Sequence, residues 1–297
     1  MAINFKTLPD KELFYGAKTC QGCAATIVSR LALKVLGEKT ILGSTASCFG
    51  ATTSVFPQSA IFVNNMLSAF PATAATVSGM SVAAEALGWD EDITMLALAG
   101  DGGTVDIGLQ ALSGAAERND NMIYICYDNE AYMNTGNQRS GVTPFKSWTT
   151  TTPTGVCSQG ERTKVKKNLF EIMVAHRIPY VATASTSYPK DFMEKVEKAK
   201  GIKGCKLIHI TAPCPTGWGF DPARSIEIGK LAVESGLWYL AEYENDEFKL
   251  NLEPKTFKPV DEYFKAQARF KHLGESDYRE IEALRDLEWK RLRKRFL

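Results

Sequence analysis

The sequence lacks the features that mark several large classes of protein. None of its apolar runs approaches the roughly 20 residues that a membrane-spanning helix needs. Residues 1–10 show no basic start followed by an apolar core, so we expect no secretory signal. The 35 Lys and Arg nearly balance the 34 Asp and Glu, which argues against a nucleic-acid partner, because phosphate binding needs a basic surplus. We therefore expect a cytoplasmic protein with no membrane span.

Histidine is scarce, and the motifs of several hydrolase families are missing. His176, His209 and His272 lie far apart, and none has a second ligand at a spacing typical of metal sites. We interpret all three as structural. The sequence contains no GxSxG, HExxH or P-loop lysine motif, so it gives no sign of serine-hydrolase, zinc-protease or P-loop chemistry.

The sequence does contain a regular alternation of apolar strands and helices. The helices carry apolar residues at intervals of three and four, whereas the strands are short runs that are apolar almost throughout. This alternation predicts an α/β fold, with a mostly parallel sheet and helices on both faces. The expected strands are Thr40–Leu42, Ile93–Ala99, Met122–Tyr127, Ile178–Ala182 and Leu207–Ile210. The expected helices are Ala24–Leu36, Thr73–Leu87, Thr104–Arg118 and Lys190–Lys200.

Two stretches depart from this alternation. Ser140–Lys167 shows no strong period, and we interpret it as a long surface excursion. Asp221–Leu297 resembles a tail, with a helix near Ser225–Ser235, a polar β-like patch and a charged helix from Glu275 onward. We predict one domain over residues 1–220 and a C-terminal extension over residues 221–297, which packs on that domain or on a partner subunit.

Polar, glycine and cysteine residues follow four of the expected strands. Because ligands of a parallel sheet bind beyond the carboxyl ends of its strands, we expect these residues to gather at one edge. The segments are the Ser/Thr-rich loop up to Cys48, Gly100–Thr104, Asp128–Gly136 and Pro213–Gly217.

Gly100–Thr104 has the composition of a phosphate-binding turn. It opens a helix, so free backbone N–H groups are available, and its glycines let a phosphate approach closely. Asp101 adds a carboxylate and Asn129 an amide oxygen, which suit a Mg²⁺ ion that also holds phosphates. GDG followed by this spacing and then Asn is the thiamine-diphosphate signature. A bare GDG is a common turn, but the strand on each side and the run Asp128–Gln138 favour the functional interpretation.

The seven cysteines divide into two groups. Cys20 and Cys23 form a CxxC pair directly before a helix, and the strand ends supply Cys48 and Cys214, the latter between two prolines. These four thiols suit a zinc or an iron–sulfur site, and the nearby carbanion-forming cofactor favours the electron carrier. We interpret the remaining three as buried or free thiols; they are Cys126, Cys157 and Cys205.

Four phenylalanines lie in the stretch after the first strand. We interpret them as core residues, with the lining of a substrate pocket as the alternative. They are Phe49, Phe56, Phe62 and Phe70.

Three segments resemble a known family closely. GDGGTVDIGLQALSGAAER (residues 100–118), YICYDNEAYMNTGNQRSGVTPF (124–145) and APCPTGW (212–218) are similar to the β subunit of pyruvate:ferredoxin oxidoreductases and related 2-oxoacid:ferredoxin oxidoreductases. The similarity runs from about the CxxC pair to the tail. It implies a thiamine-diphosphate-binding fold that holds thiamine diphosphate, Mg²⁺ and the [4Fe–4S] cluster nearest to that cofactor.

The resemblance also implies a role for individual residues. Asp101, Asn129 and the backbone carbonyl of Ala131 become Mg²⁺ ligands, and Asn134 falls where the family places a polar side chain near the reacting thiazolium. The residues that cradle the diphosphate are Gly100, Gly102, Gly103 and Thr104. The cluster ligands are Cys20, Cys23, Cys48 and Cys214.

In this family a 2-oxoacid is decarboxylated on thiamine diphosphate, electrons pass through the cluster to ferredoxin, and the acyl group passes to coenzyme A. The resemblance thus implies an α subunit, which supplies the glutamate that activates the aminopyrimidine ring, together with γ and δ subunits. One alternative is a non-redox thiamine-diphosphate decarboxylase or lyase in which the CxxC pair binds zinc or nothing. Another is an electron-relay subunit with a vestigial cofactor pocket.

The chain departs from the family pattern after the third cysteine. Pyruvate-type members carry Leu-Glu-Val and a Tyr-Pro-x-x-Ala-Trp stretch there, whereas this chain has Cys48-Phe49-Gly50-Ala51 and then Phe56-Pro57-Gln58-Ser59-Ala60-Ile61. The acid and the tryptophan are both missing. A branched-chain 2-oxoacid, an aryl 2-oxoacid or oxalate is therefore an alternative to pyruvate as the substrate.

Overall fold

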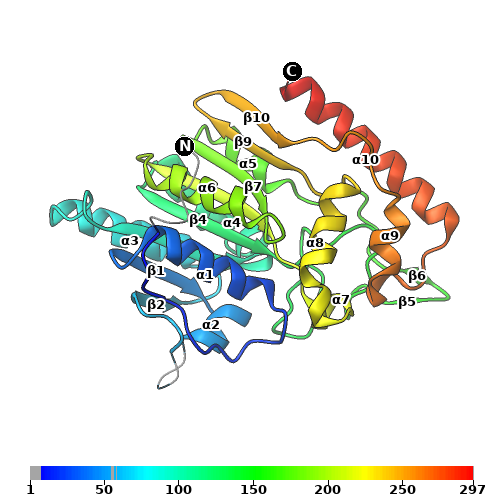
Figure 1. The fold of residues 1–297 in the computed structure, drawn as a ribbon, viewed down its shortest axis with the longest axis horizontal. Helices are drawn as coiled ribbons and strands as arrows, with labels where there is room; N and C mark the ends of the chain where they lie inside the picture. The colour runs from blue at the N-terminus through cyan, green and yellow to red at the C-terminus, as the bar shows by residue number, and fades with distance from the viewer. Residues whose placement is uncertain (1–7, 55–56, 58, 297) are drawn as a thin grey trace.

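One eight-stranded sheet organises the chain in the computed structural model, which describes residues 8–54, 57 and 59–296 (Figure 1). The strand order is β10-β9-β7-β8-β4-β3-β1-β2. The strands are β1 (Thr40–Thr45), β2 (Asn64–Ser68), β3 (Thr94–Gly100), β4 (Met122–Asp128), β7 (Tyr180–Ser185), β8 (Cys205–Thr211), β9 (Leu240–Glu244) and β10 (Glu247–Leu252). A separate hairpin is formed by β5 (Thr154–Gly155) and β6 (Ser158–Gln159).

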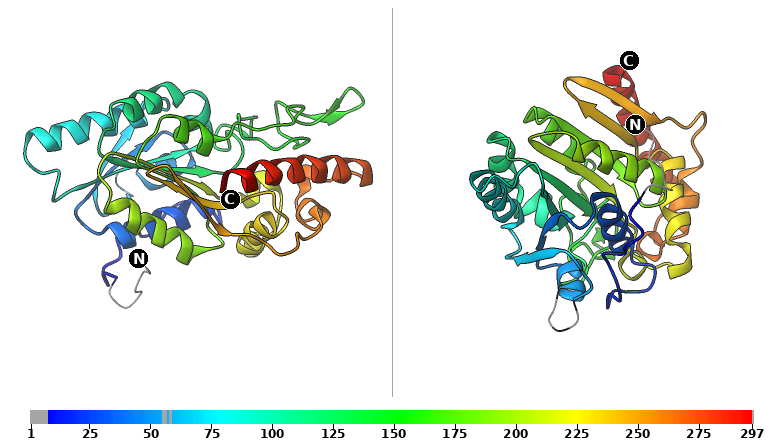
Figure 2. Two further views of the ribbon diagram at one scale, coloured as in Figure 1. Left: turned by 90° about the horizontal axis from the view of Figure 1, so that it is seen from above. Right: turned by 60° about the vertical axis from the view of Figure 1, so that its left-hand side comes forward.

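The six strands from β2 to β7 in this order pair in parallel, and helices cover both of their faces (Figure 2). Side chains alternate along a strand, so Ile125 of β4 joins one apolar cluster and Tyr124 and Cys126 join the other. The first cluster contains α1 (Ala24–Leu36) and α6 (Pro189–Lys200), and the second contains α3 (Thr73–Ala86), α4 (Leu109–Glu117) and α5 (Leu169–Ala175). The predicted α/β fold is confirmed.

The C-terminal part of the chain adds two strands and three helices to this body. β9 pairs antiparallel with β7 and β10 pairs with β9, so the polar β-like patch extends the sheet. The helices are α8 (Ser225–Glu234), α9 (Val260–Lys265) and α10 (Glu275–Phe296), and their apolar side chains form a third cluster. The division at residue 220 stays a prediction. In the described residues, no helix is both long and apolar enough to cross a bilayer.

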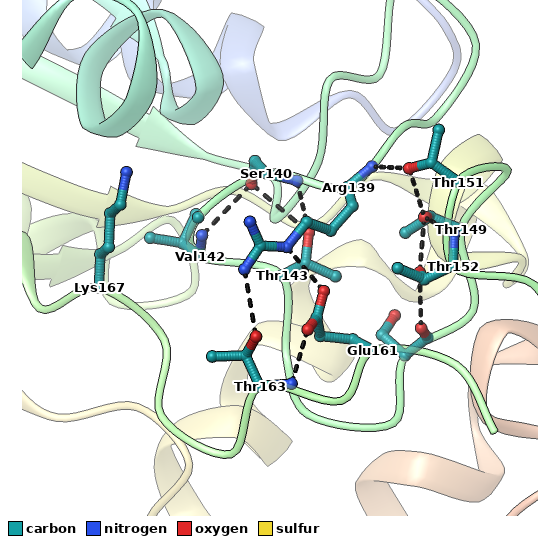
Figure 3. Close-up of polar contacts among 12 residues, drawn as sticks. Arg139, Ser140, Val142, Thr143, Thr149, Thr151, Thr152, Glu161, Thr163 and Lys167 are labelled. Atoms are coloured by element: carbon teal, nitrogen blue, oxygen red, sulfur yellow. Dashed lines mark hydrogen bonds and ion pairs between the residues drawn. The ribbon is translucent and has the colours of Figure 1, made fainter. Parts of the chain in front are cut away.

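The interpretation of Ser140–Lys167 as a surface excursion is wrong for its first ten residues. Residues 140–149 do not lie on the surface: Ser140 and Val142 are fully buried, because this stretch folds back onto Asp101 and Asp106. The hairpin β5–β6 and the residues that lead into it are exposed or half-buried and project from the body, as expected (Figure 2). Figure 3 shows how the stretch is held, with Arg139 paired to Glu161 at 2.7 Å.

The four phenylalanines have different environments. Phe49 is buried against Phe14, as expected for a core residue. Phe62 is 57% exposed, which contradicts a core position. Phe70 is half-buried and lines a pocket, so the alternative holds for it. Phe56 lies outside the described residues.

Candidate cofactor and metal site

The carboxyl ends of β1, β3 and β4 open onto one pocket, and most of the predicted cofactor residues line it. They are Gly100, Asp101, Gly102, Gly103, Asn129, Ala131 and Asn134, and Cys48 joins them from α2 (Cys48–Thr53). The other lining residues are Ala46, Ser47, Phe70, Tyr127, Tyr132, Met133 and Thr135. Residues that follow the carboxyl ends of three different strands therefore line one pocket, as the strand-end rule predicts.

Three polar groups converge at the floor of this pocket. One terminal atom of the Asn129 amide lies 2.9 Å from the Ala131 carbonyl oxygen and 3.0 Å from Asp101 Oδ1. If this atom is nitrogen, it donates two hydrogen bonds; if it is oxygen, three oxygens meet, and a cation between them is needed to offset their repulsion. The donor set of carboxylate, amide and carbonyl oxygens thus fits a hard divalent cation.

Asp101 is held in a buried, negatively charged environment. Its carboxyl is 1% exposed, and Ser140 Oγ donates a hydrogen bond of 2.5 Å to Oδ2. Burial first, and then the nearby Asp128 carboxylate, raise the pKa of Asp101 well above its usual range. Without a counter-ion this site therefore favours a proton, and a bound cation would replace that proton.

The glycine turn itself is a short π-helix, Gly102–Asp106, rather than the start of the expected α-helix. Its i to i−5 pattern, with Ile107 N–H donating to the Gly102 carbonyl at 3.3 Å, leaves the preceding N–H groups without intrahelical partners. A Cβ on Gly102 would lie 2.6 Å from the Tyr132 ring, and one on Gly103 would lie 2.9 Å from the Phe70 ring. Only glycine fits at these two positions.

Thr104 does not present its side chain to the pocket. Its hydroxyl is buried, donates to the Gly100 carbonyl at 2.8 Å and lies 3.1 Å from the Tyr124 hydroxyl. The expected role of Thr104 in cradling a diphosphate therefore does not extend to its hydroxyl, because that group is hydrogen-bonded within the core. Only its backbone could contribute to the pocket.

The four selected thiols lie close enough to influence one another's ionisation. Burial raises the pKa of Cys48 to about 12, and the charges of Cys214, Cys23 and Cys20 add to that shift. Burial likewise raises the pKa of Cys214 to about 11, again with contributions from Cys23 and Cys20. Segments separated by almost 200 residues thus lie within electrostatic range of one another, and their service as ligands of one cluster stays a prediction.

Local structure fixes two of these thiols. Ser47 caps α2 and accepts a 2.7 Å hydrogen bond from the Tyr127 hydroxyl, which sets Cys48 at the first helical position. Cys214 precedes α7 (Pro215–Trp218), where the Gly217 N–H donates to its Sγ at 3.3 Å. Among the described His, Cys, Asp and Glu residues, no three lie as close together as a single metal ion requires.

The three cysteines interpreted as buried or free thiols do not line the pocket. Cys126 and Cys205 are fully buried within β4 and β8, and Cys157 is exposed on the β5–β6 hairpin. Sequence analysis assigned no role to three residues that hold the site together, namely Ser140, Tyr132 and Trp218. They lie within the segments that carry the family resemblance, but each acts through a contact with a distant segment.

Comparisons with known proteins agree with this geometry. Residues 43–210 match the thiamine pyrophosphate enzyme, C-terminal TPP binding domain. The chain is 52% identical over 287 residues to pyruvate synthase subunit PorB of Methanothermobacter thermautotrophicus, covering 96% of this chain and 99% of that one. It is 46% identical to ketoisovalerate oxidoreductase subunit VorB of Pyrococcus furiosus, covering 97% and 94%. The chain belongs to the β subunits of the 2-oxoacid:ferredoxin oxidoreductases.

A solved structure supports the fold of this β subunit. It is the 2-oxoglutarate:ferredoxin oxidoreductase from Magnetococcus marinus with 2-oxoglutarate, coenzyme A and succinyl-CoA bound, which aligns with a TM-score of 0.58 and 22% identity over 76% of this chain and 82% of that one. The matched domain of this β subunit contains the whole pocket and Cys48, whereas Cys20, Cys23 and Cys214 flank it. The chain is thus a subunit of a multi-subunit oxidoreductase that carries a thiamine-diphosphate-binding domain.

Proposed function

We propose that this β subunit binds Mg²⁺–thiamine diphosphate in the pocket and a [4Fe–4S] cluster on Cys20, Cys23, Cys48 and Cys214. The observation that carries the proposal is the position of Cys48, which lines the same pocket as Asp101 and Asn129. An electron acceptor held by this thiol would lie directly beside the cofactor. That arrangement suits an oxidative decarboxylation better than a non-redox lyase.

The residues of the floor would hold the metal and the diphosphate. Asp101, Asn129 and the Ala131 carbonyl would be Mg²⁺ ligands, and the free N–H groups of the Gly102–Asp106 turn would face the diphosphate. Asn134 is exposed at the rim, where its amide would hydrogen-bond and orient the substrate. Phe70 and Tyr132, in edge-to-face contact at 5.7 Å, form an apolar wall beside the Gly102–Gly103 turn.

The two prosthetic groups supply the chemistry that side chains cannot. Thiamine diphosphate, when bound, supplies the carbanion chemistry by which a 2-oxoacid loses carbon dioxide, and an iron–sulfur cluster supplies an acceptor for single electrons. The protein contributes thiols whose pKa is raised first by burial and then by the charges of the neighbouring cysteines, and a bound metal would offset both effects, because a metal-bound thiol is deprotonated. The Gly217 N–H bond to Cys214 stabilises that thiolate further.

We propose that a second chain completes the site. The cavity measures about 130 Å³, well below the roughly 300–1,000 Å³ of pockets that enclose ligands of cofactor size. An α subunit that covers the pocket and supplies the glutamate for the aminopyrimidine ring fits this geometry, with γ and δ subunits and ferredoxin as further partners. The acyl group would pass to coenzyme A. For the substrate we propose pyruvate or a branched-chain 2-oxoacid, which the names of the relatives support.

Anaerobic purification and turnover of the complete complex test this proposal. We expect iron and acid-labile sulfide in the preparation, and reduction of a low-potential dye that depends on a 2-oxoacid and on coenzyme A. A panel of pyruvate, a branched-chain 2-oxoacid, phenylglyoxylate and oxalate identifies the substrate. A colourless, iron-free preparation with full activity, or carbon dioxide release without dye reduction, would instead indicate the non-redox alternative.

Magnesium affinity is expected to fall as the solution is acidified. The raised pKa of Asp101 means that a proton and the cation compete for its carboxylate, so below that pKa the apparent affinity should fall about tenfold for each unit of pH. Calorimetric titration of Mg²⁺ into the complex, in buffers of different ionisation enthalpy, measures both the affinity and the protons released. An affinity that stays constant with pH would contradict the assignment of Asp101 as a ligand.

A further inference from the structure

Glu130 lies between the two residues proposed as magnesium ligands, Asn129 and Ala131. Its φ of 65° places it in the left-handed region, which an L residue with a side chain rarely adopts. The Glu130 N–H donates to Asp128 Oδ1 at 2.8 Å, which supports this turn of the backbone. The left-handed turn lets the side chain of Asn129 and the carbonyl of Ala131 face the same point.

The Glu130 side chain is paired with two cations from distant parts of the chain. Arg269 Nη2 donates to Glu130 Oε2 at 2.6 Å, and Lys166 Nζ donates to Oε1 at 2.8 Å. The Glu130 and Arg269 side chains are only 5% and 3% exposed. Removing one partner of a buried pair leaves an uncompensated charge, so the arrangement of this turn depends on both.

Arg269 also fixes the segment that carries Cys214. Its guanidinium lies 3.9 Å from the centre of the Trp218 ring, in a stacking contact that lysine does not reproduce. The Trp218 indole in turn donates a 2.8 Å hydrogen bond to the backbone carbonyl of Asn129. Trp218 ends α7, which begins directly after Cys214.

We propose that Arg269, in the C-terminal extension, is a positioning residue that fixes the metal-binding turn through Glu130 and the Cys214 segment through Trp218. This inference rests on the proposed function, because it assigns a purpose to the geometry of that site. The contacts run from Glu130 to Arg269, from Arg269 to Trp218 and from Trp218 back to Asn129, the chain neighbour of Glu130. Glu130 and Arg269 are 139 positions apart in the sequence. The C-terminal extension thereby acts on the cofactor site without lining the pocket.

Substitution of Arg269 in the complete complex tests the inference. After removal of bound cofactor, the Kd of thiamine diphosphate is measured by calorimetry at fixed Mg²⁺. We expect Arg269→Gln and Glu130→Gln each to raise this Kd roughly 10–100-fold, the usual effect of losing a residue that orients a metal ligand. Arg269→Lys should recover only part of the affinity. Lysine restores the positive charge, but it has neither the planar set of N–H donors of the guanidinium nor its stacking contact with Trp218.

Arg285→Gln is the matched control. Arg285 lies on α10 with its side chain 10% exposed and its guanidinium 4.8 Å from the centre of the Phe257 ring, and its partners Ser235 and Asp286 do not line the pocket. We expect its loss to lower the thermal midpoint of the cofactor-free complex as Arg269→Gln does. The additional stabilisation on adding Mg²⁺ and thiamine diphosphate should shrink in Arg269→Gln alone.

The outcomes separate this inference from the function on which it rests. If wild-type binding requires Mg²⁺ and Asp101→Ala removes it, yet Arg269→Gln and Glu130→Gln bind as wild type does, only the positioning role is overturned. If wild type binds thiamine diphosphate equally well without Mg²⁺, the proposed metal site itself fails. Should the Arg269→Gln complex not assemble, the thiamine diphosphate affinity of the isosteric Glu130→Gln variant tests the positioning role instead: a raised Kd supports it and a wild-type Kd overturns it.

Discussion

Replacing Asp101 by alanine should lower the turnover of the complete complex by more than about 100-fold, beyond the usual effect of losing an outer-sphere partner of a metal. Asp101 is the only charged group among the three proposed ligands, so its loss removes the attraction that holds Mg²⁺ against the uncharged Asn129 and Ala131 oxygens. Without the cation, the charge of a bound diphosphate would have no positive ion beside it in the pocket. Dye-linked turnover at saturating Mg²⁺ and thiamine diphosphate measures the effect.

Asp120→Ala is the control for this substitution. Asp120 is also buried and ion-paired, with Arg118 at 3.0 Å, but it precedes β4 and so lies at the opposite edge of the sheet from the pocket. Its removal should lower stability while leaving turnover near the wild-type value. Turnover of Asp101→Ala within about twofold of wild type would mean that the pocket is vestigial, as in the electron-relay alternative.

The sequence predicted the parts of the site that depend on where strands end. Short apolar runs located both ends of β3 and β4 within one residue and the centre of β8, and the parallel sheet then placed the polar residues after β3 and β4 at one edge. The same reasoning chose Cys214 rather than Cys205, since one follows β8 and the other begins it. The positions of the two cysteines relative to β8 are confirmed, and the role of Cys214 as a ligand stays a prediction.

Contacts between distant segments were not predictable in this way. Ser140 reaches Asp101 from a stretch with no periodicity, and the hydrophilic composition of that stretch concealed its burial. The pairing of Glu130 with Arg269 joins residues 139 positions apart and leaves no pattern in either segment. The π-helical turn that directs Thr104 inward depends on the packing of Tyr132 and Phe70 against glycines, which only the folded chain defines.

The iron content of two cysteine variants tests the geometry of the thiols most directly. Cys214→Ser should cost the complex about four irons per β subunit, the content of one [4Fe–4S] cluster, and should abolish substrate-dependent dye reduction. Serine cannot replace the thiolate that the Gly217 N–H stabilises beside the pocket. Iron and acid-labile sulfide, measured on anaerobically purified complexes, give the result.

Cys205→Ser is the matched substitution and should keep the full iron content. Cys205 is fully buried at the start of β8, and its pKa is raised to about 12 by burial and to a smaller extent by the charge of Asp120, not by the other cysteines. Its replacement places a hydroxyl in the apolar core, at an expected cost of about 1–3 kcal/mol of stability, without touching the cluster ligands. Equal iron in the two variants would show that Cys214 is not a ligand, because a thiol at the amino end of a strand and one at its carboxyl end cannot serve the same metal centre.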